Sequence, residues 1–168
     1  MSALEDLLER FRRGAELLAM ATTGAAGPEL DYKPEGFPLS IRQLVCHLAD
    51  YEAVSVMRFR HVIAEDNPVL PNFDGDAWAE KLDYARRKLS QPLETFRRLR
   101  TENYELLKEL PELTFARAGA HTTDGPRTLG QLAQGSTEHL EDHVREIQSI
   151  RAAYREHRVR QQAAQQAT

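Results

Sequence analysis

The stretch "TLGQLAQGSTEHLEDHVREIQ" (128–148) combines the pattern of a long amphipathic helix with two histidines, His139 and His143. Four residues make about one turn of an α-helix, so both imidazoles leave the same face, one above the other. Leu140 and Ile147 recur at the spacing of core residues on the same helix. The stretch therefore predicts a helix that carries a stacked histidine pair beside the hydrophobic core.

The rest of the chain shows the same helical period. We expect a helix over the first twenty residues, with Ser2 as its cap, and a second over 40–64, capped by Ser40. A third should begin near Ser90 and run to 110, and the last, capped by Thr128, should span 128–157. Segments 22–40, 65–76 and 111–127 are rich in glycine and proline and are expected to be loops. A short amphipathic piece surrounds Trp78, which we interpret as a core or interface plug.

Four long helices joined by loops predict an all-α protein, a four-helix bundle with essentially no sheet. The long connections after the first two helices leave room for parallel neighbouring helices. "SIRQL" (40–44) and "TLGQL" (128–132) echo each other, which suggests related placement of two helices. We expect one domain over residues 1–160, followed by a polar tail, 161–168, without fixed structure.

Composition narrows the class of partner. A net charge of -4, with both signs mixed along the chain, argues against nucleic acid binding. We found neither an apolar run long enough to span a bilayer nor a secretion signal, so we expect no membrane partner. The single cysteine, Cys46, is compatible with a reducing compartment, and we expect a soluble cytoplasmic protein that acts on a small molecule. Leu4, Leu8 and Phe11 form an apolar stripe that suggests a homodimer.

Two imidazoles do not hold a divalent ion, so a metal site needs a further ligand. His47 borders the inward face of the second helix and can face the histidine pair across the bundle. Asp50, on the same face, can accept the second ring N–H of a liganding histidine or bind a metal directly. Spacing alone leaves open the alternative that the pair is simply two partly exposed polar residues.

Several other sites are excluded by their spacing. No glutamate has a histidine three residues later, as carboxylate-bridged di-iron bundles require, and Leu140 after His139 breaks the H-E-x-x-H pattern of metalloproteases. The sequence contains no G-x-S-x-G, G-x-G-x-x-G or phosphate-binding loop. Hydrolase elbows and nucleotide cradles therefore have no support.

"SIRQLVCHLADYE" (40–52) and residues 128–148 resemble the two signature helices of the DinB-like, or YfiT-like, superfamily. The resemblance implies a four-helix bundle of up-down-down-up topology. It also implies a divalent metal, typically zinc or nickel, bound by three histidines, which match His47, His139 and His143.

This sequence departs from a common family form at Leu140, Asp142 and Glu146. These departures leave the histidines intact and concern the residues around them. Among characterised branches of the family are transferases and isomerases that use low-molecular-weight thiols, so the resemblance also implies a thiol as a candidate cofactor.

Three histidine ligands leave one coordination position open, as in catalytic zinc sites. We therefore predict a metal-dependent enzyme, a hydrolase or a thiol-dependent transferase. Asp50 and Tyr51 are the expected catalytic residues, and the loops "AGPELDYKPEGF" (26–37) and "GAHTTDGPR" (119–127) the expected rim. The alternatives are a non-catalytic metal-binding or stress-response bundle, with Asp50 closing the site, and a bundle whose histidines bind nothing.

Overall fold

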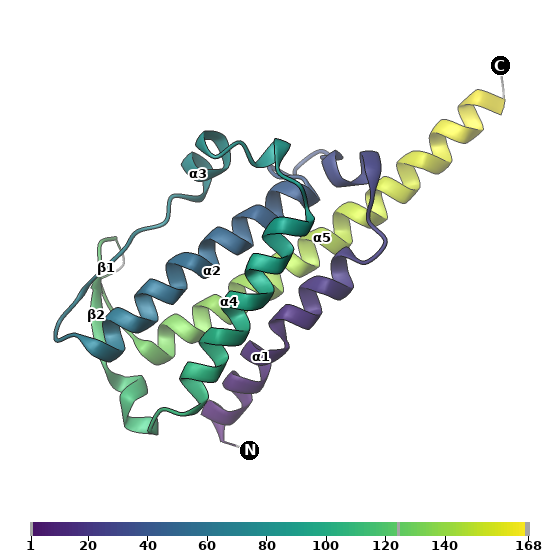
Figure 1. Ribbon diagram of the computed structural model, residues 1–168. Coiled ribbons are helices and arrows are strands. Elements are labelled where there is room, and N and C mark those ends of the chain that lie inside the picture. The colour runs from purple at the N-terminus through teal and green to yellow at the C-terminus, as the bar shows by residue number, and fades with distance from the viewer. Residues whose placement is uncertain (1, 124, 167–168) are drawn as a thin grey trace.

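The computed structural model describes residues 2–123 and 125–166. Its α-helices are α1 (Ala3–Thr22), α2 (Ile41–Ala64), α3 (Gly75–Lys81), α4 (Ser90–Lys108) and α5 (Leu129–Gln166) (Figure 1). The short 3-10 turns are η1 (Gly27–Asp31), η2 (Tyr84–Arg86) and η3 (Glu112–Ala116). The four long helices form the bundle, and the prediction of an all-α fold is confirmed. No helix in the described part of the chain has the length and apolar character needed to cross a membrane.

The starts of the two helices that carry the histidines are set by the same local device. At α2, the backbone N–H of Ser40 donates to Oε1 of Gln43 at 3.0 Å, and the Gln43 N–H donates back to the Ser40 hydroxyl. At α5, Thr128 and Gln131 make the same reciprocal pair. The echo between the two sequences is therefore a repeated capping box, which satisfies N–H groups that a helix start leaves without partners.

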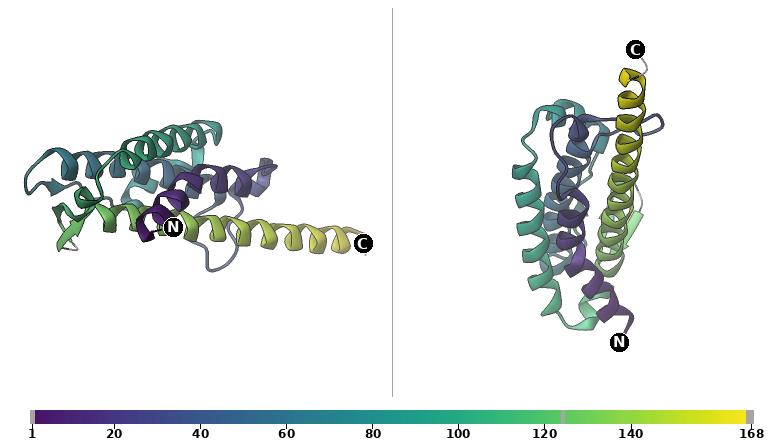
Figure 2. Two further views of the ribbon diagram at one scale, coloured as in Figure 1. Left: turned by 90° about the horizontal axis from the view of Figure 1, so that it is seen from below. Right: turned by 90° about the vertical axis from the view of Figure 1, so that its right-hand side faces the viewer.

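The bundle has the expected up-down-down-up order. α1 packs against α5 and α4, and α2 packs against α4 and α5. In Figure 1, α1 and α5 run in one direction while α2 and α4 run in the other. α2 and α5 are thus antiparallel neighbours, which brings the start of α2 beside the middle of α5 (Figure 2).

Two clusters of buried apolar side chains hold the helices together, one toward each end of the bundle. Phe11, which we expected on an exposed stripe, is completely buried among them, and Leu4 and Leu8 pack against the same cluster. This stripe is core, so the surface argument for a homodimer was wrong. Self-association itself stays a prediction.

A small three-stranded sheet lies at one end of the bundle, where we expected only loops. Its strands are β1 (Val69–Leu70), β2 (Ala118–His121) and β3 (Gly125–Thr128), with β1 parallel to β2 and β3 antiparallel to it. Strands this short show no alternation to detect, and their pairing joins distant parts of the chain. Leu70 is fully buried, and a Cβ at Gly119 would lie only 2.7 Å from its Cδ2.

The C-terminal segment also differs from expectation. Instead of ending near His157, α5 continues to Gln166 and projects beyond the other helices (Figure 2). Its last turns are exposed and consist mainly of glutamine, alanine and arginine, which are good helix formers. Residues 161–166 are therefore helical in this structure, and residues 167–168 lie outside the described part.

Candidate metal centre and adjoining cavity

Two facing stripes of side chains build the candidate site. Along α2, His47, Tyr51, Ser55 and Arg58 follow one another at spacings of three or four residues. The facing stripe of α5 contains Leu132, Gly135, His139, His143 and Glu146. Residues at these spacings lie on one face of a helix. Because the helices are antiparallel, the histidine end of one stripe meets the histidine end of the other.

The structure brings the three predicted ligands together. Ligand atoms of His47, His139 and His143 all lie within 4.8 Å of one another, and Nε2 of His47 is 3.0 Å from Nε2 of His139. Among the described residues, these three histidines form a group that could hold a metal ion, and Cys46 is not part of it. Cys46 instead lies buried with its sulfur near the Tyr84 carbonyl oxygen.

Burial keeps the imidazoles of His47 and His139 neutral near neutral pH. Burial, together with the neighbouring His143, lowers the pKa of His47 to about 4. Burial, assisted by the other two histidines and Arg100, lowers the pKa of His139 to about 3. Near neutral pH both rings therefore keep the nitrogen lone pair that a metal ion requires.

The hydrogen bonds around the cluster fit a metal. Nδ1 of His143 lies 2.8 Å from Oε2 of Glu146, and since a carboxylate only accepts, Nδ1 carries the proton. Nε2 of His143 is then left as a ligand atom. Nδ1 of His47 is buried without a hydrogen-bond partner on the side of the ring toward Gly75, so the nitrogen that converges on the other histidines is Nε2. Three imidazoles are a donor set suited to zinc, nickel or copper.

Residues between β1 and α3 cover the histidines, which sequence reasoning missed. Phe73 packs against His47 with ring centroids 5.3 Å apart, and Trp78 packs on Phe73. Trp78 is therefore part of this cover and not a core plug. A Cβ at Gly75 would lie 2.7 Å from Cε1 of His47, so the glycine lets the backbone approach the ring. The aromatic residues flanking a glycine were the available signal.

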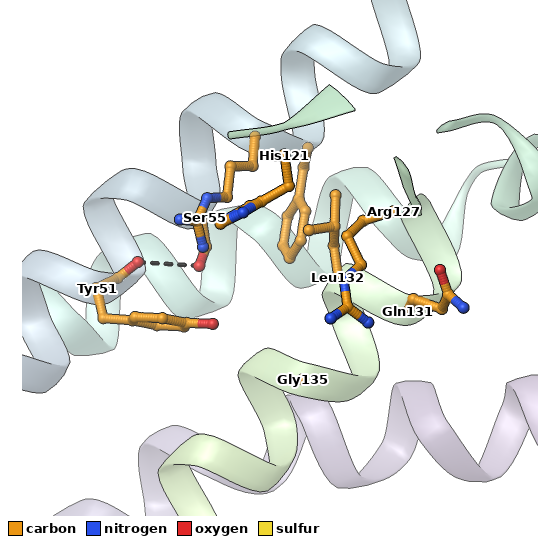
Figure 3. Close-up of a pocket in the computed structure, with 9 residues that line it drawn as sticks. Tyr51, Ser55, His121, Arg127, Gln131, Leu132 and Gly135 are labelled. Carbon is orange, nitrogen blue, oxygen red and sulfur yellow. Dashed lines mark hydrogen bonds between the residues drawn. The ribbon is translucent and has the colours of Figure 1, made fainter. Parts of the chain in front are cut away.

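A cavity of about 190 Å³ lies farther along the two stripes, next to Tyr51 (Figure 3). Tyr51 connects the two regions because its ring stacks on His139, with centroids 4.1 Å apart, and also lines the cavity. The other lining residues are Ser55, Arg58, Phe59, His121, Arg127, Gln131, Leu132 and Gly135. Loop 119–127 thus contributes to the rim, as expected.

The other predicted site features lie elsewhere. Asp50 is not in the histidine group, and its carboxylate accepts a hydrogen bond of 2.5 Å from the Tyr84 hydroxyl. The loop 26–37 packs on the far part of α5, where Tyr32 stacks on His157 and Glu29 pairs with Arg151. Among the described residues, this loop makes no contact with His47, His139 or His143. The catalytic roles of Asp50 and Tyr51 stay predictions.

A second buried polar group lies between the same helices. Glu52 on α2 and Arg100 on α4 form an ion pair of 2.7 Å with both side chains essentially unexposed. Asn103 donates to the other Glu52 oxygen at 2.8 Å, and Arg100 also reaches Ser136 of α5. The Arg100 guanidinium stacks over Phe11. This network adds a fixed positive charge near His139, which contributes to its lowered pKa.

Known proteins share this sequence pattern and fold. A protein of Oceanobacillus iheyensis named "putative metal-dependent hydrolase" is 27% identical over 122 residues, 73% of this chain and 69% of that protein. YfiT of Bacillus subtilis, which carries the same description, is 26% identical over 121 residues, 72% of this chain and 64% of YfiT.

The solved structure of YfiT, described as "a probable metal-dependent hydrolase with an unusual four-helix bundle topology", superposes with a TM-score of 0.76. The match has 25% identity and covers 88% of this chain and 87% of YfiT. A family model of the DinB superfamily matches residues 10–147, a range that contains all three histidines. The chain therefore belongs to the DinB superfamily.

Proposed function

We propose that the protein is a metal-dependent hydrolase whose centre is a divalent ion held by His47, His139 and His143. The observation that carries the proposal is the convergence of three imidazoles at one end of two facing stripes whose other residues line a cavity. The names of the relatives agree with it. When bound, such an ion supplies Lewis-acid chemistry, polarising a substrate carbonyl and making water more acidic.

The shortage of protein ligands favours an enzyme over a closed binding site. Among the described residues, the histidine group has three members and includes no carboxylate or thiolate. Asp50, the rival fourth ligand, is engaged by Tyr84. Three protein ligands leave room for substrate or solvent, whereas structural zinc sites use four.

Tyr51 is the side chain best placed to assist the reaction. Burial raises the pKa of its hydroxyl, an effect that the Arg58 charge opposes, so the group stays protonated at neutral pH. It therefore acts as a hydrogen-bond donor to a substrate oxygen in the cavity and not as a base. Tyr51→Phe, which keeps the ring stacked on His139, is expected to lower kcat by about a hundredfold while metal content stays unchanged.

The test of the metal centre is the metal content of the untagged protein. His143→Ala should lose most of the bound metal, and His157→Ala, on a distant turn of the same helix beside Tyr32, should keep it. Elemental analysis of both variants, followed by a screen of ester and amide substrates, measures this. Equal metal content in the two variants would show that the ligand assignment is wrong.

The identity of the ion and the use of a thiol are tested in the same screen. We propose zinc or nickel, because both accept imidazole ligands readily. Turnover that appears only when a low-molecular-weight thiol is added would replace the hydrolase with a thiol-dependent transferase. Bound metal without turnover in either arm, combined with a first shell that accepts no added ligand, would support a non-catalytic metal-binding protein.

A further inference from the structure

Arg58 is a buried positive charge for which the described residues provide no acidic partner. Its side chain is on the cavity wall and the residue is only 5% exposed. Nε donates to the Pro71 carbonyl oxygen at 2.9 Å, and one terminal nitrogen lies 3.1 Å from Nε2 of His121. In the described part of the chain no carboxylate lies within ion-pair distance of this guanidinium. A buried charge without a counter-ion is costly, so an anion bound in the cavity would relieve it.

Arg100 shows that a buried arginine in this fold can have a carboxylate partner. Arg100 is equally buried, and Glu52 neutralises it at 2.7 Å. Arg58 faces open volume where Arg100 faces a carboxylate. Of the two arginines buried in the described part of the chain, Arg100 is thus compensated by a carboxylate and Arg58 lies beside a cavity of about 190 Å³.

The cavity wall is suited to an anion. None of its lining residues carries a carboxylate, and they include the guanidinium of Arg127, the hydroxyl of Tyr51 and the amide of Gln131. Figure 3 shows the Tyr51 hydroxyl and the Arg127 guanidinium on the side of the cavity nearest Gly135. Guanidinium groups bind carboxylates and phosphates through charge-assisted hydrogen bonds, which are stronger than neutral ones.

The position of Arg58 connects the cavity to the histidines. Its guanidinium lies 5.7 Å from the centroid of the Tyr51 ring, and the same ring stacks on His139 with centroids 4.1 Å apart. The Tyr51 ring therefore contacts both the buried charge and the candidate metal centre.

We propose that the cavity binds the oxyanion group, a carboxylate or a phosphate, of a small anionic substrate, with Arg58 as its electrostatic anchor. The assignment of that molecule as substrate rests on the proposed hydrolase. The binding of the anion does not, because the cavity wall contains no metal ligand. Arg58 thus selects anionic substrates and orients the bond to be cleaved toward the histidines.

Isothermal titration calorimetry of the full-length protein tests the anchor directly. The probes are succinate and benzoate for a carboxylate, and inorganic phosphate for a phosphate, each titrated at constant ionic strength. We expect the wild type to bind at least one probe, and Arg58→Gln to weaken that binding by about tenfold or more. Arg58→Lys should retain part of the affinity. Phosphate binding without carboxylate binding would identify a phosphate ester as the ligand class, and the reverse a carboxylate.

Two controls make the result decisive. Arg60→Gln removes an arginine of the same helix that pairs with Glu102 on the surface, and it should leave the affinity unchanged. His143→Ala, which lacks a candidate metal ligand, should bind the anion as the wild type does. Wild-type protein that binds none of the probes at millimolar concentration, or equal affinity in Arg58→Gln, would overturn the proposal. If the protein binds metal but no anion, only the anion proposal fails and the proposed hydrolase is unaffected. If it binds an anion but no metal, only the proposed hydrolase fails.

Discussion

The histidine cluster and the Glu52–Arg100 network are both buried polar groups between α2 and its neighbours, but only in the network do opposite charges pair with each other. In the network, each charge meets an opposite charge, and Asn103 and Ser136 add further hydrogen bonds. Among the described residues, the cluster consists of three imidazole rings that converge without a carboxylate or thiolate in the group. The charges of the network compensate each other inside the fold, although Nε and Nη1 of Arg100 have no hydrogen-bond partner. Three converging imidazoles, by contrast, indicate a place where a metal ion can bind.

The two groups also differ in what covers them. The network is enclosed by the long helices and by the ring of Phe11. The cluster is covered by Phe73 and the short helix α3, which has no buried residue. Elements with few buried contacts open most easily, so we expect the cover over the histidines to open more readily than the long helices around the network.

The largest effect is expected from breaking the buried Glu52–Arg100 ion pair. Glu52→Ala leaves the Arg100 charge buried without a partner and should lower the free energy of unfolding by about 3 to 5 kcal/mol. Glu102→Ala, which removes the exposed partner of Arg60, should cost no more than about 1 kcal/mol. Urea unfolding of both variants measures the difference, and similar losses would mean that burial does not distinguish the two pairs.

Binding of a metal ion at the histidine cluster should stabilise the protein. Added zinc or nickel at about 100 times its dissociation constant should raise the free energy of unfolding of metal-free protein by about 2.7 kcal/mol. Magnesium, which prefers oxygen ligands, should have no such effect. Thermal unfolding with each ion measures this. A zinc-induced shift that persists in His143→Ala would place the ion somewhere other than the histidine cluster.

The buried histidines should also make the metal-free protein less stable in acid. His47 and His139 have folded-state pKa values of about 4 and 3, below the ordinary value of 6.5. Above pH 6.5 the two imidazoles are mainly neutral in both the folded and the unfolded state. As the pH falls below 6.5, they bind protons in the unfolded chain but stay neutral in the folded protein. Stability should therefore fall by roughly 2 kcal/mol per histidine between pH 6.5 and 5.

Unfolding of metal-free protein in denaturant across this pH window measures the slope. Carboxylates contribute mainly at lower pH, so the window isolates the histidines. The double variant His47→Gln, His139→Gln should show a flatter profile than the wild type. An equally steep profile would assign the acid sensitivity to other groups.

The smallest effect concerns the cover. Gly75→Ala places a methyl group 2.7 Å from Cε1 of His47, so the ring must shift. Metal affinity should fall about tenfold, in line with other residues that orient ligands, while overall stability changes little. Asp76→Ala, one residue along and exposed, is the matched control. If competition with a chelator gives the same affinity for both variants, Gly75 does not position the ring.

Much of the site was predictable because its residues are close in sequence. The capping boxes at Ser40 and Thr128 require only residues three apart, and helical spacing places His139 above His143. Glu146 lies three residues after His143 on the same face, so its hydrogen bond could also have been found from spacing. Asp50 was predicted as a partner on the same reasoning, yet the Tyr84 hydroxyl, from a distant turn, is what it contacts.

The sequence by itself determined the helices, their caps and the histidine faces, because each depends on bonds between residues within one or two turns. The tertiary structure alone decided the rest. The parallel pairing of β1 with β2, the approach of Gly75 to His47 and the burial of Arg58 beside a cavity all join segments distant in sequence. Such contacts depend on how whole helices pack and on where connecting segments find room. No local period encodes them, and so the metal ligands could be predicted from spacing whereas the cavity next to them could not.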